Sequence, residues 1–215
     1  MIKIKICGIT GVEDAMTAVE AGADALGFIF VEGTPRYVKP EQAAAIVRAL
    51  PPFVTPVGVF WDHPADHIKA VAEACGLRAL QFHGDEPPEA LVQHALPAIK
   101  TVKLAPSVDL GGKPPWAFGV AERYRGCAAA ILLDSAARWS EGEPRQPIEW
   151  TVARQLAAGA WRIILSAGLT PDNVGRAITT VRPYAVDVNS GVEASPGRKD
   201  PDKVWRFVTE ARRAL

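Results

Sequence analysis

Residues 1–10 read Met-Ile-Lys-Ile-Lys-Ile-Cys-Gly-Ile-Thr, an alternating stretch that ends near a thiol and a glycine. Successive side chains of an extended strand point to opposite faces, so the three isoleucines share one face and Lys3, Lys5 and Cys7 share the other. A face that carries two lysines and a thiol is unsuited to a dry core. The alternation therefore predicts a first strand whose polar face borders a reaction site.

The rest of the chain alternates between segments typical of strands and segments typical of helices. Thr10 is the expected N-cap of the first helix. Residues 105–115 and 136–147 are expected to be irregular. The expected strands cover residues 1–7, 23–31, 54–60, 78–83, 98–104, 129–134, 162–166 and 184–188, and the expected helices cover residues 10–22, 40–50, 64–74, 87–96, 116–124, 148–158, 171–181 and 201 onward.

Strands that alternate with helices are expected to be parallel and joined by right-handed crossovers. Eight such units favour an α/β fold of the (β/α)₈ TIM barrel type, with an open doubly wound sheet as the alternative. That alternative lacks its usual signal, because Cys-Gly-Ile-Thr-Gly at residues 7–11 is not a G-x-G-x-x-G turn. No linker divides the chain, so residues 1–215 are expected to form a single barrel domain.

The composition argues against several classes of function. The 24 basic and 24 acidic residues leave no net charge, so no global field attracts nucleic acid or an anionic membrane. No apolar run approaches the roughly 20 residues that a membrane-spanning helix needs, and a cytoplasmic location is expected. Cys7, Cys75 and Cys127 have neither paired nor metal-type spacing, which predicts reduced thiols, no metal site, and burial of Cys75 and Cys127.

Polar residues recur on one face near the ends of the expected strands. Because the active site of such a barrel lies at the C-terminal ends of its strands, Cys7, His83, Asp134 and Asp187 are expected to converge there. Each residue alone also has a purely structural interpretation, as a buried thiol, a hydrogen-bonded core histidine or a helix cap. Their joint placement on one rim favours a site.

Two consecutive loops contain small residues after the last two expected strands. They read Ser166-Ala-Gly-Leu-Thr170 and Asn189-Ser-Gly-Val-Glu193. Small residues let backbone N–H groups approach a ligand, and these loops commonly bind phosphate in (β/α)₈ barrels. Ala167, Gly168, Ser190 and Gly191 are therefore the expected phosphate-binding residues, with plain tight turns as the alternative.

Several segments, in order along residues 3–203, resemble the phosphoribosylanthranilate isomerase family of tryptophan biosynthesis. Cys-Gly-Ile-Thr and Pro-Arg-Tyr-Val are specific to that family, whereas the phosphate loops occur in many barrels. The matching segments are Lys5-Ile-Cys-Gly-Ile-Thr10, Gly27-Phe-Ile-Phe30, Thr34-Pro-Arg-Tyr-Val38, Val57-Gly-Val-Phe60, Leu80-Gln-Phe-His-Gly84, Leu132-Leu-Asp-Ser135, Val186-Asp-Val-Asn-Ser-Gly-Val-Glu193 and Pro196-Gly197.

The resemblance implies an Amadori rearrangement of N-(5-phosphoribosyl)anthranilate, a small phosphorylated aminosugar, without cofactor or metal. It makes Asp134 the general acid that opens the furanose ring and Cys7 the general base that removes the proton from the sugar C2 carbon. It assigns Arg36 to the anthranilate carboxylate and Asp187 to the sugar hydroxyls. His83 is a further expected substrate-binding residue.

These roles set requirements on acidity. A thiol with an ordinary pKa near roughly 8.5 becomes a useful base when that pKa falls, and Lys5 on the same face is the candidate for lowering it. Asp134 must keep its proton, through burial or through a neighbouring carboxylate such as Asp187.

The chain departs from the resembled family at two places. Residues 138–145 replace a glycine-rich mobile loop with a charged segment, and Ala167 stands where a second glycine is usual. Two other functions stay open: a barrel paralogue that isomerises another phosphorylated aminosugar, and a phosphosugar-binding barrel without turnover. A paralogue that acts on a substrate with two phosphates would need a second anion site. The expected assembly is a monomer or a homodimer.

Overall fold

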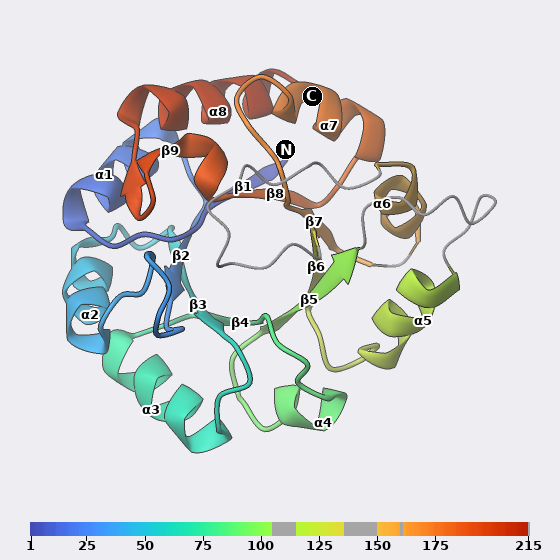
Figure 1. The fold of residues 1–215 in the computed structure, drawn as a ribbon, viewed down its shortest axis with the longest axis horizontal. Coiled ribbons are helices and arrows are strands. Elements are labelled where there is room, and N and C mark those ends of the chain that lie inside the picture. Colours follow the sequence, from blue (N-terminus) through green and yellow to red (C-terminus); the bar gives the residue numbers. More distant parts are fainter. Residues whose placement is uncertain (105–114, 136–149, 160, 215) are drawn as a thin grey trace.

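The computed structural model describes residues 1–104, 115–135, 150–159 and 161–214. The two segments expected to be irregular, and the charged segment 138–145 with them, lie outside the described residues except for position 115. Position 115 begins a helix. Figure 1 shows strands around a central axis with helices in an outer ring.

The barrel strands and the outer helices alternate along the chain. The strands are β1 (Lys3–Ile6), β2 (Ala25–Ile29), β3 (Thr55–Phe60), β4 (Ala79–Phe82), β5 (Ala98–Leu104), β6 (Ala130–Ser135), β7 (Ile163–Leu165) and β8 (Ala185–Val188). The helices are α1 (Val12–Ala21), α2 (Pro40–Ala49), α3 (Ala65–Cys75), α4 (Pro88–Leu91), α5 (Pro115–Arg123), α6 (Trp150–Ala157), α7 (Val174–Val181) and α8 (Pro201–Arg213).

The sheet closes on itself in the order β1 to β8. Neighbouring barrel strands are parallel, and β1 pairs with β8 so that Lys5 lies opposite Asp187. Closure confirms the predicted (β/α)₈ barrel, and the alternative of an open doubly wound sheet was wrong. The closure also brings the first and last strands of the barrel side by side.

The alternation within each strand separates an outer core from the barrel interior. Outward side chains such as Ile4, Phe28 and Val186 pack with the helices in the main hydrophobic cluster. The inward residues near the N-terminal ends form a smaller apolar floor of Ala130, Leu132, Ile164 and Ala185. Polar side chains fill the interior between that floor and the mouth: Lys5, Gln81, His83, Thr101, Asp134 and Asp187, all of them buried.

The first helix begins differently from the prediction. Gly11, not Thr10, is the N-cap of α1, and no side chain caps this helix. The Thr10 hydroxyl instead donates a hydrogen bond to the carbonyl oxygen of Gly197, 2.7 Å away. The Thr10 hydroxyl therefore bonds to a residue distant in the sequence and does not cap the helix that follows it.

Two other helices are shorter than predicted. Helix α4 covers four residues of the expected 87–96, because Leu91 is its only buried side chain and Pro97 disfavours helical geometry at the residue before it. Helix α7 begins at Val174 and not at 171, since Thr170 and Asn173 form a turn in which Thr170 N donates to Asn173 Oδ1 at 2.9 Å.

Short elements that the sequence did not predict follow β8. A 3₁₀ turn, η1 (Ser190–Val192), leads into a small antiparallel hairpin of β9 (Glu193–Ser195) and β10 (Arg198–Lys199). This hairpin lies beside α1 and α8 in Figure 1.

The three cysteines are free thiols. Cys7 and Cys75 are buried, but Cys127 is only partly buried, so the prediction of a fully buried Cys127 was wrong. Cys127 lies after α5, in a turn where its sulfur contacts the carbonyl oxygen of Tyr124 at 3.1 Å. In the described residues, no helix is both long and apolar enough to cross a membrane.

The N-terminal face of the barrel is held by the carboxylate of Asp24. Its Oδ2 accepts hydrogen bonds from Ile4 N at 2.9 Å and from Arg212 Nη2 at 2.8 Å, and its Oδ1 accepts one from Lys3 Nζ at 2.8 Å. Partial burial opposes ionisation, but these bonds outweigh it and lower the pKa of Asp24. Because Arg212 belongs to α8, the carboxylate ties the first strand to the last helix.

We expect Asp24→Asn to lower the free energy of unfolding at neutral pH by about 1 kcal/mol, a value kept small by the partial exposure of these ion pairs. A lowered pKa in the folded state stabilises the protein above the unfolded-state pKa of roughly 3.9, and this contribution is lost as the pH falls through the folded-state value. Denaturant unfolding of parent and variant should therefore differ at neutral pH and converge in acid, below the lowered pKa of Asp24. An equal difference at both pH values would contradict the ionic role.

Candidate active site

A pocket of about 440 Å³, its opening included, lies at the C-terminal mouth of the barrel. Its walls come from the ends of the strands and from the loops that follow them, as in other barrels of this type. The lining residues are Cys7, Ile29, Thr34, Arg36, Val59, Gln81, His83, Leu132, Asp134, Ser166, Asp187 and Asn189.

The thiol of Cys7 shares the interior with a buried ion pair. Lys5 Nζ donates to Asp187 Oδ1 at 2.8 Å, and Ser166 Oγ lies 3.3 Å from Asp187 Oδ2. Gly27 on β2 makes the room: a Cβ there would lie 2.6 Å from Cys7 Sγ and 3.0 Å from Lys5 Nζ. The inward glycine therefore allows thiol and ammonium to lie together.

The acidity of Cys7 differs from the expected direction. Burial raises the pKa of the Cys7 thiol above its usual value, and the positive charge of Lys5 offsets this only in part. Burial also opposes the charge of Lys5, but the carboxylate of Asp187 more than compensates and raises the pKa of Lys5. The predicted influence of Lys5 on Cys7 is thus present, but the net lowering that we expected was wrong for the ligand-free protein.

His83 and Asp134 face each other across the pocket wall. His83 Nε2 lies 3.6 Å from Asp134 Oδ2, while Asp134 Oδ1 accepts a hydrogen bond from Ser135 N at 2.8 Å. The amide of Gln81 and the hydroxyl of Thr101 contact His83 Nδ1 at 3.4 and 3.3 Å. The imidazole and the carboxylate thus lie near each other, at a separation longer than a hydrogen bond.

Asp187 is paired within the barrel interior. Its two carboxylate oxygens contact Lys5 and Ser166. The ammonium of Lys5 balances its charge within the interior.

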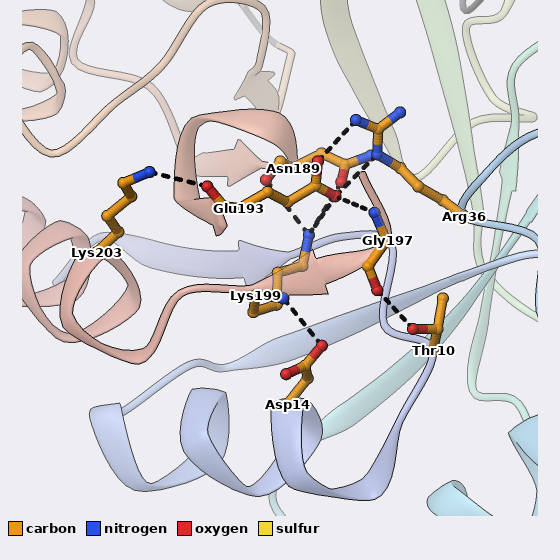
Figure 2. A network of polar contacts seen from close by, with 8 residues as sticks. All are labelled: Thr10, Asp14, Arg36, Asn189, Glu193, Gly197, Lys199 and Lys203. Carbon is orange, nitrogen blue, oxygen red and sulfur yellow. Dashed lines mark hydrogen bonds and ion pairs between the residues drawn. The ribbon is translucent and has the colours of Figure 1, made fainter. Parts of the chain in front are cut away.

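Arg36 reaches the pocket from the loop after β2. Its Nε and Nη2 donate to the two carboxylate oxygens of Glu193 at 2.8 and 2.7 Å, a two-pronged ion pair drawn in Figure 2. Lys199 Nζ contacts the same carboxylate at 3.2 Å. Burial opposes ionisation of Glu193, but the bonds from Arg36 and the charge of Lys199 hold its pKa below the usual range.

The loops after β7 and β8 approach each other closely. A Cβ on Gly191 would lie 1.9 Å from the carbonyl oxygen of Leu169, so only glycine fits between them. Ala167 and Gly168 both have a positive φ, 64° and 63°. A left-handed conformation costs a non-glycine residue about 1–2 kcal/mol. The methyl group of Ala167 packs in the hydrophobic core, so the fold accommodates it.

The structure therefore places some of the predicted site residues in one pocket and leaves others outside its lining. Five predicted residues line a single pocket: Cys7, Arg36, His83, Asp134 and Asp187. The predicted phosphate residues do not line it, although Ser166 and Asn189, which directly precede Ala167 and Ser190, do. The two phosphate loops thus border the pocket from the side of β7 and β8.

Sequence reasoning missed Gly27, Glu193 and Lys199. The inward position of Gly27 in the second strand was a usable signal, because a glycine at such a position opens space next to its neighbours. Glu193 lay within a motif already noted for its family resemblance. Lys199 gave no signal, because its role depends on a hairpin that the sequence did not predict.

The described residues contain no group of three or more histidine, cysteine, aspartate or glutamate side chains that could hold a metal ion. Together a thiol, a carboxylate and an arginine suit proton transfer on a small anionic substrate.

Fold and site define a (β/α)₈-barrel enzyme with acid–base groups at its C-terminal mouth. The family model for N-(5'phosphoribosyl)anthranilate (PRA) isomerase matches residues 4–210. The chain belongs to this family, and its activity is that of an isomerase in tryptophan biosynthesis.

Relatives match over nearly the full length. The N-(5'-phosphoribosyl)anthranilate isomerase of Geobacter sp. strain M21 is 47% identical over 215 residues, which cover 99% of each chain. The crystal structure of the Thermotoga maritima enzyme has a TM-score of 0.87 at 40% identity and 99% coverage of both chains. Another solved phosphoribosyl anthranilate isomerase, with a TM-score of 0.85, 40% identity and 99% coverage of both chains, is in complex with reduced 1-(o-carboxyphenylamino)-1-deoxyribulose 5-phosphate.

The raised pKa of Cys7 leads to a direct test. We expect the thiol to be protonated at neutral pH in the ligand-free protein and to titrate above the ordinary thiol value, because burial disfavours the thiolate. The thiolate absorbance in the ultraviolet, measured against pH with Cys7→Ser as the reference, reports this titration. A thiolate already formed at neutral pH would show that Lys5 dominates over burial.

The close approach of the two phosphate loops gives a second test. We expect Gly191→Ala to lower the free energy of unfolding by about 1–3 kcal/mol, because its methyl group would overlap the Leu169 carbonyl and push the loops apart. Gly175→Ala is the matched control, since a Cβ there meets only Glu210 O at 3.7 Å and alanine favours the helix. Denaturant unfolding measures both. Equal free energies of unfolding for Gly191→Ala and the parent would show that the methyl group does not crowd the Leu169 carbonyl.

Proposed function

We propose that this pocket converts N-(5-phosphoribosyl)anthranilate to 1-(2-carboxyphenylamino)-1-deoxyribulose 5-phosphate, with Asp134 as general acid and Cys7 as general base. The observation that carries the proposal is the convergence of both residues and Arg36 on one pocket bordered by two glycine-containing loops. Membership of the isomerase family supports the same reaction.

In the first step, Asp134 protonates the ring oxygen of the ribose, and the C1–O bond breaks. The lone pair of the anilino nitrogen forms the C=N bond of an iminium ion. His83, with Nε2 3.6 Å from the Asp134 carboxylate, lies beside this acid in the pocket wall. Asp134 is almost fully buried, so the acid works away from bulk water.

In the second step, Cys7 removes the proton from C2, and the electrons of the C–H bond neutralise the iminium ion to give an enolamine. The enolamine then tautomerises to the aminoketone. Burial raises the pKa of Cys7, so the thiol must release its own proton to solvent before this step. The iminium charge formed in the first step favours the resulting thiolate and thus activates the base at the stage where it is needed.

The remaining groups hold the ends of the substrate. Arg36 binds the anthranilate carboxylate through Nη1, which makes no hydrogen bond to the described part of the chain. Backbone N–H groups of Ala167, Gly168, Ser190 and Gly191 bind the phosphate.

The sugar hydroxyls lie between those ends. Asp187 accepts a hydrogen bond from one of them. Buried Gln81 Oε1 has no hydrogen-bond partner within the described residues, so a substrate hydroxyl that donates to it would satisfy this oxygen.

Reduced cysteines and a metabolic substrate support a cytoplasmic location for this chain. For assembly, a monomer or a homodimer is consistent with a site built within one chain. Analytical ultracentrifugation of the purified protein distinguishes these two states.

Turnover of N-(5-phosphoribosyl)anthranilate, followed by its loss of fluorescence, tests the function. We expect Cys7→Ser and Asp134→Asn each to lower kcat by about 10²–10⁴-fold, the usual contribution of a general acid or base. Cys75→Ser is the matched control for a thiol outside the pocket, and we expect it to keep the parent kcat. An inactive parent would contradict the isomerase proposal, whereas an active parent with a fast Cys7→Ser variant would contradict only the base assignment.

A further inference from the structure

Arg36 is held from behind by the hairpin that follows β8. The two bonds to Glu193 occupy Nε and Nη2, and they fix the plane of the guanidinium in the direction shown in Figure 2. A long arginine side chain otherwise samples many rotamers, and fixing one of them costs free energy at the moment of binding. Glu193 removes that cost before substrate arrives.

A glutamate in this position also creates a problem for the binding of an anion. One arginine and one glutamate form a neutral pair, which attracts a carboxylate poorly. Lys199 resolves this, because its ammonium contacts the same Glu193 carboxylate at 3.2 Å. With Lys199 in its ammonium form, two cations and one anion give the cluster a net charge of one positive unit beside the pocket.

Burial opposes the charge of Lys199 and lowers the pKa of its ammonium below the usual value, while the Glu193 carboxylate favours the charged form. The Lys199 side chain is fully buried, and Nζ has three oxygen acceptors: Glu193 Oε1 at 3.2 Å, Asn189 Oδ1 at 3.0 Å and Asn189 O at 3.3 Å. An ammonium has three N–H donors, so all of them are satisfied. Asn189 itself lines the pocket, so the same contacts fix a second pocket residue.

The hairpin is attached firmly to the barrel. Lys199 N donates to Asp14 Oδ2 at 3.0 Å, and Thr10 Oγ1 donates to Gly197 O at 2.7 Å. Gly197 packs so closely that a Cβ there would lie 2.5 Å from the carbonyl oxygen of Pro35. The hairpin therefore sits directly against the backbone of the residue before Arg36.

We propose that Glu193 and Lys199 are positioning residues for the isomerase reaction: Glu193 orients Arg36, and Lys199 restores the positive charge that Glu193 would cancel. A net charge of one unit suits a carboxylate better than a doubly charged phosphate, so the pair also sets the specificity of this end of the pocket. The inference rests on the proposed function, since it takes Arg36 as the carboxylate-binding group.

The test compares the normal substrate with its carboxamide analogue, N-(5-phosphoribosyl)anthranilamide, which keeps the shape and loses the charge. The ratio of kcat/KM for the two compounds measures recognition of the carboxylate, and a role confined to folding would not change that ratio. The parent should favour the carboxylate, and Arg36→Met should remove the preference. If Arg36→Met keeps it, the assignment of Arg36 in the proposed function is wrong and this inference falls with it.

Glu193→Gln separates orientation from charge. The variant makes the cluster more positive but replaces one acceptor oxygen by an amide donor, so Arg36 loses its second bond. We expect the preference for the carboxylate to fall on the order of tenfold, the loss of one charge-assisted hydrogen bond. An unchanged or stronger preference would show that charge alone matters and would overturn the orienting role of Glu193.

Lys199→Met makes the opposite change, because it removes charge and leaves the bonds between Arg36 and Glu193 in place. The charge of Lys199 also favours the Cys7 thiolate, so a fall in kcat shared by both compounds is expected. The inference predicts in addition that the ratio of kcat/KM for the carboxylate over the carboxamide falls about tenfold. Lys203→Met is the matched control, since Lys203 binds the main-chain oxygen of Glu193 at 2.8 Å and is half-exposed. Its ratio of the two kcat/KM values should match that of the parent.

Equal losses for both substrates in Glu193→Gln and Lys199→Met would show that the pair has no role in recognition of the carboxylate and overturn the inference. If Glu193→Gln does not fold, because Lys199 is left buried without its carboxylate, the double variant Glu193→Gln/Lys199→Met replaces it. This double variant removes the buried Lys199 charge and leaves unpaired only Arg36, which is partly exposed, so it should fold with the carboxylate preference reduced. Retention of the full preference in the folded double variant would also overturn the inference.

Discussion

The buried ion pair between Lys5 and Asp187 is the interaction on which the rest of the site depends. The two residues lie opposite each other where the first and last strands of the barrel meet, with Lys5 Nζ 2.8 Å from Asp187 Oδ1. A lone charge in this interior would be very costly, and loss of one partner of a buried pair typically costs about 3–5 kcal/mol. Because the two charges neutralise each other, the barrel can close around them. The pair also places an ammonium group beside Cys7.

Charged side chains are also paired at the edge of the pocket, but there the positive and negative charges are unequal in number. Lys5 and Asp187 cancel each other, so the centre of the barrel offers proton-transfer groups without a strong net field. Arg36, Lys199 and Glu193 do not cancel, and they leave positive charge at one end. The loop after β8 carries Glu193 of this cluster, and Asn189 at its start contacts Lys199. The positive charge and the expected phosphate-binding residues Ser190 and Gly191 therefore belong to the same edge of the pocket.

The strand periodicity made much of this predictable. Alternation in the late strands correctly placed Cys7, His83, Asp134 and Asp187 in the interior, because a barrel forces alternate side chains inward. Predictions from local sequence were wrong where a residue distant in the sequence bonds to the same atoms. The Thr10 hydroxyl was assigned to a helix cap, but Gly197, far along the chain, accepts its hydrogen bond. Helix α4 was overextended because only Leu91 finds a place in the core.

By itself, the sequence determined the closed βα architecture, the inward face of each strand and the identity of the groups at the mouth. These features follow from periodicity and residue type, which are local properties of the chain. The tertiary structure alone decided the acidity of Cys7, where burial outweighs Lys5, and the pairing of Asp187 with Lys5. It also decided the support of Arg36 by Glu193 and Lys199, residues more than 150 positions away in the sequence. Such effects depend on distance and solvent exclusion, which only the folded chain defines.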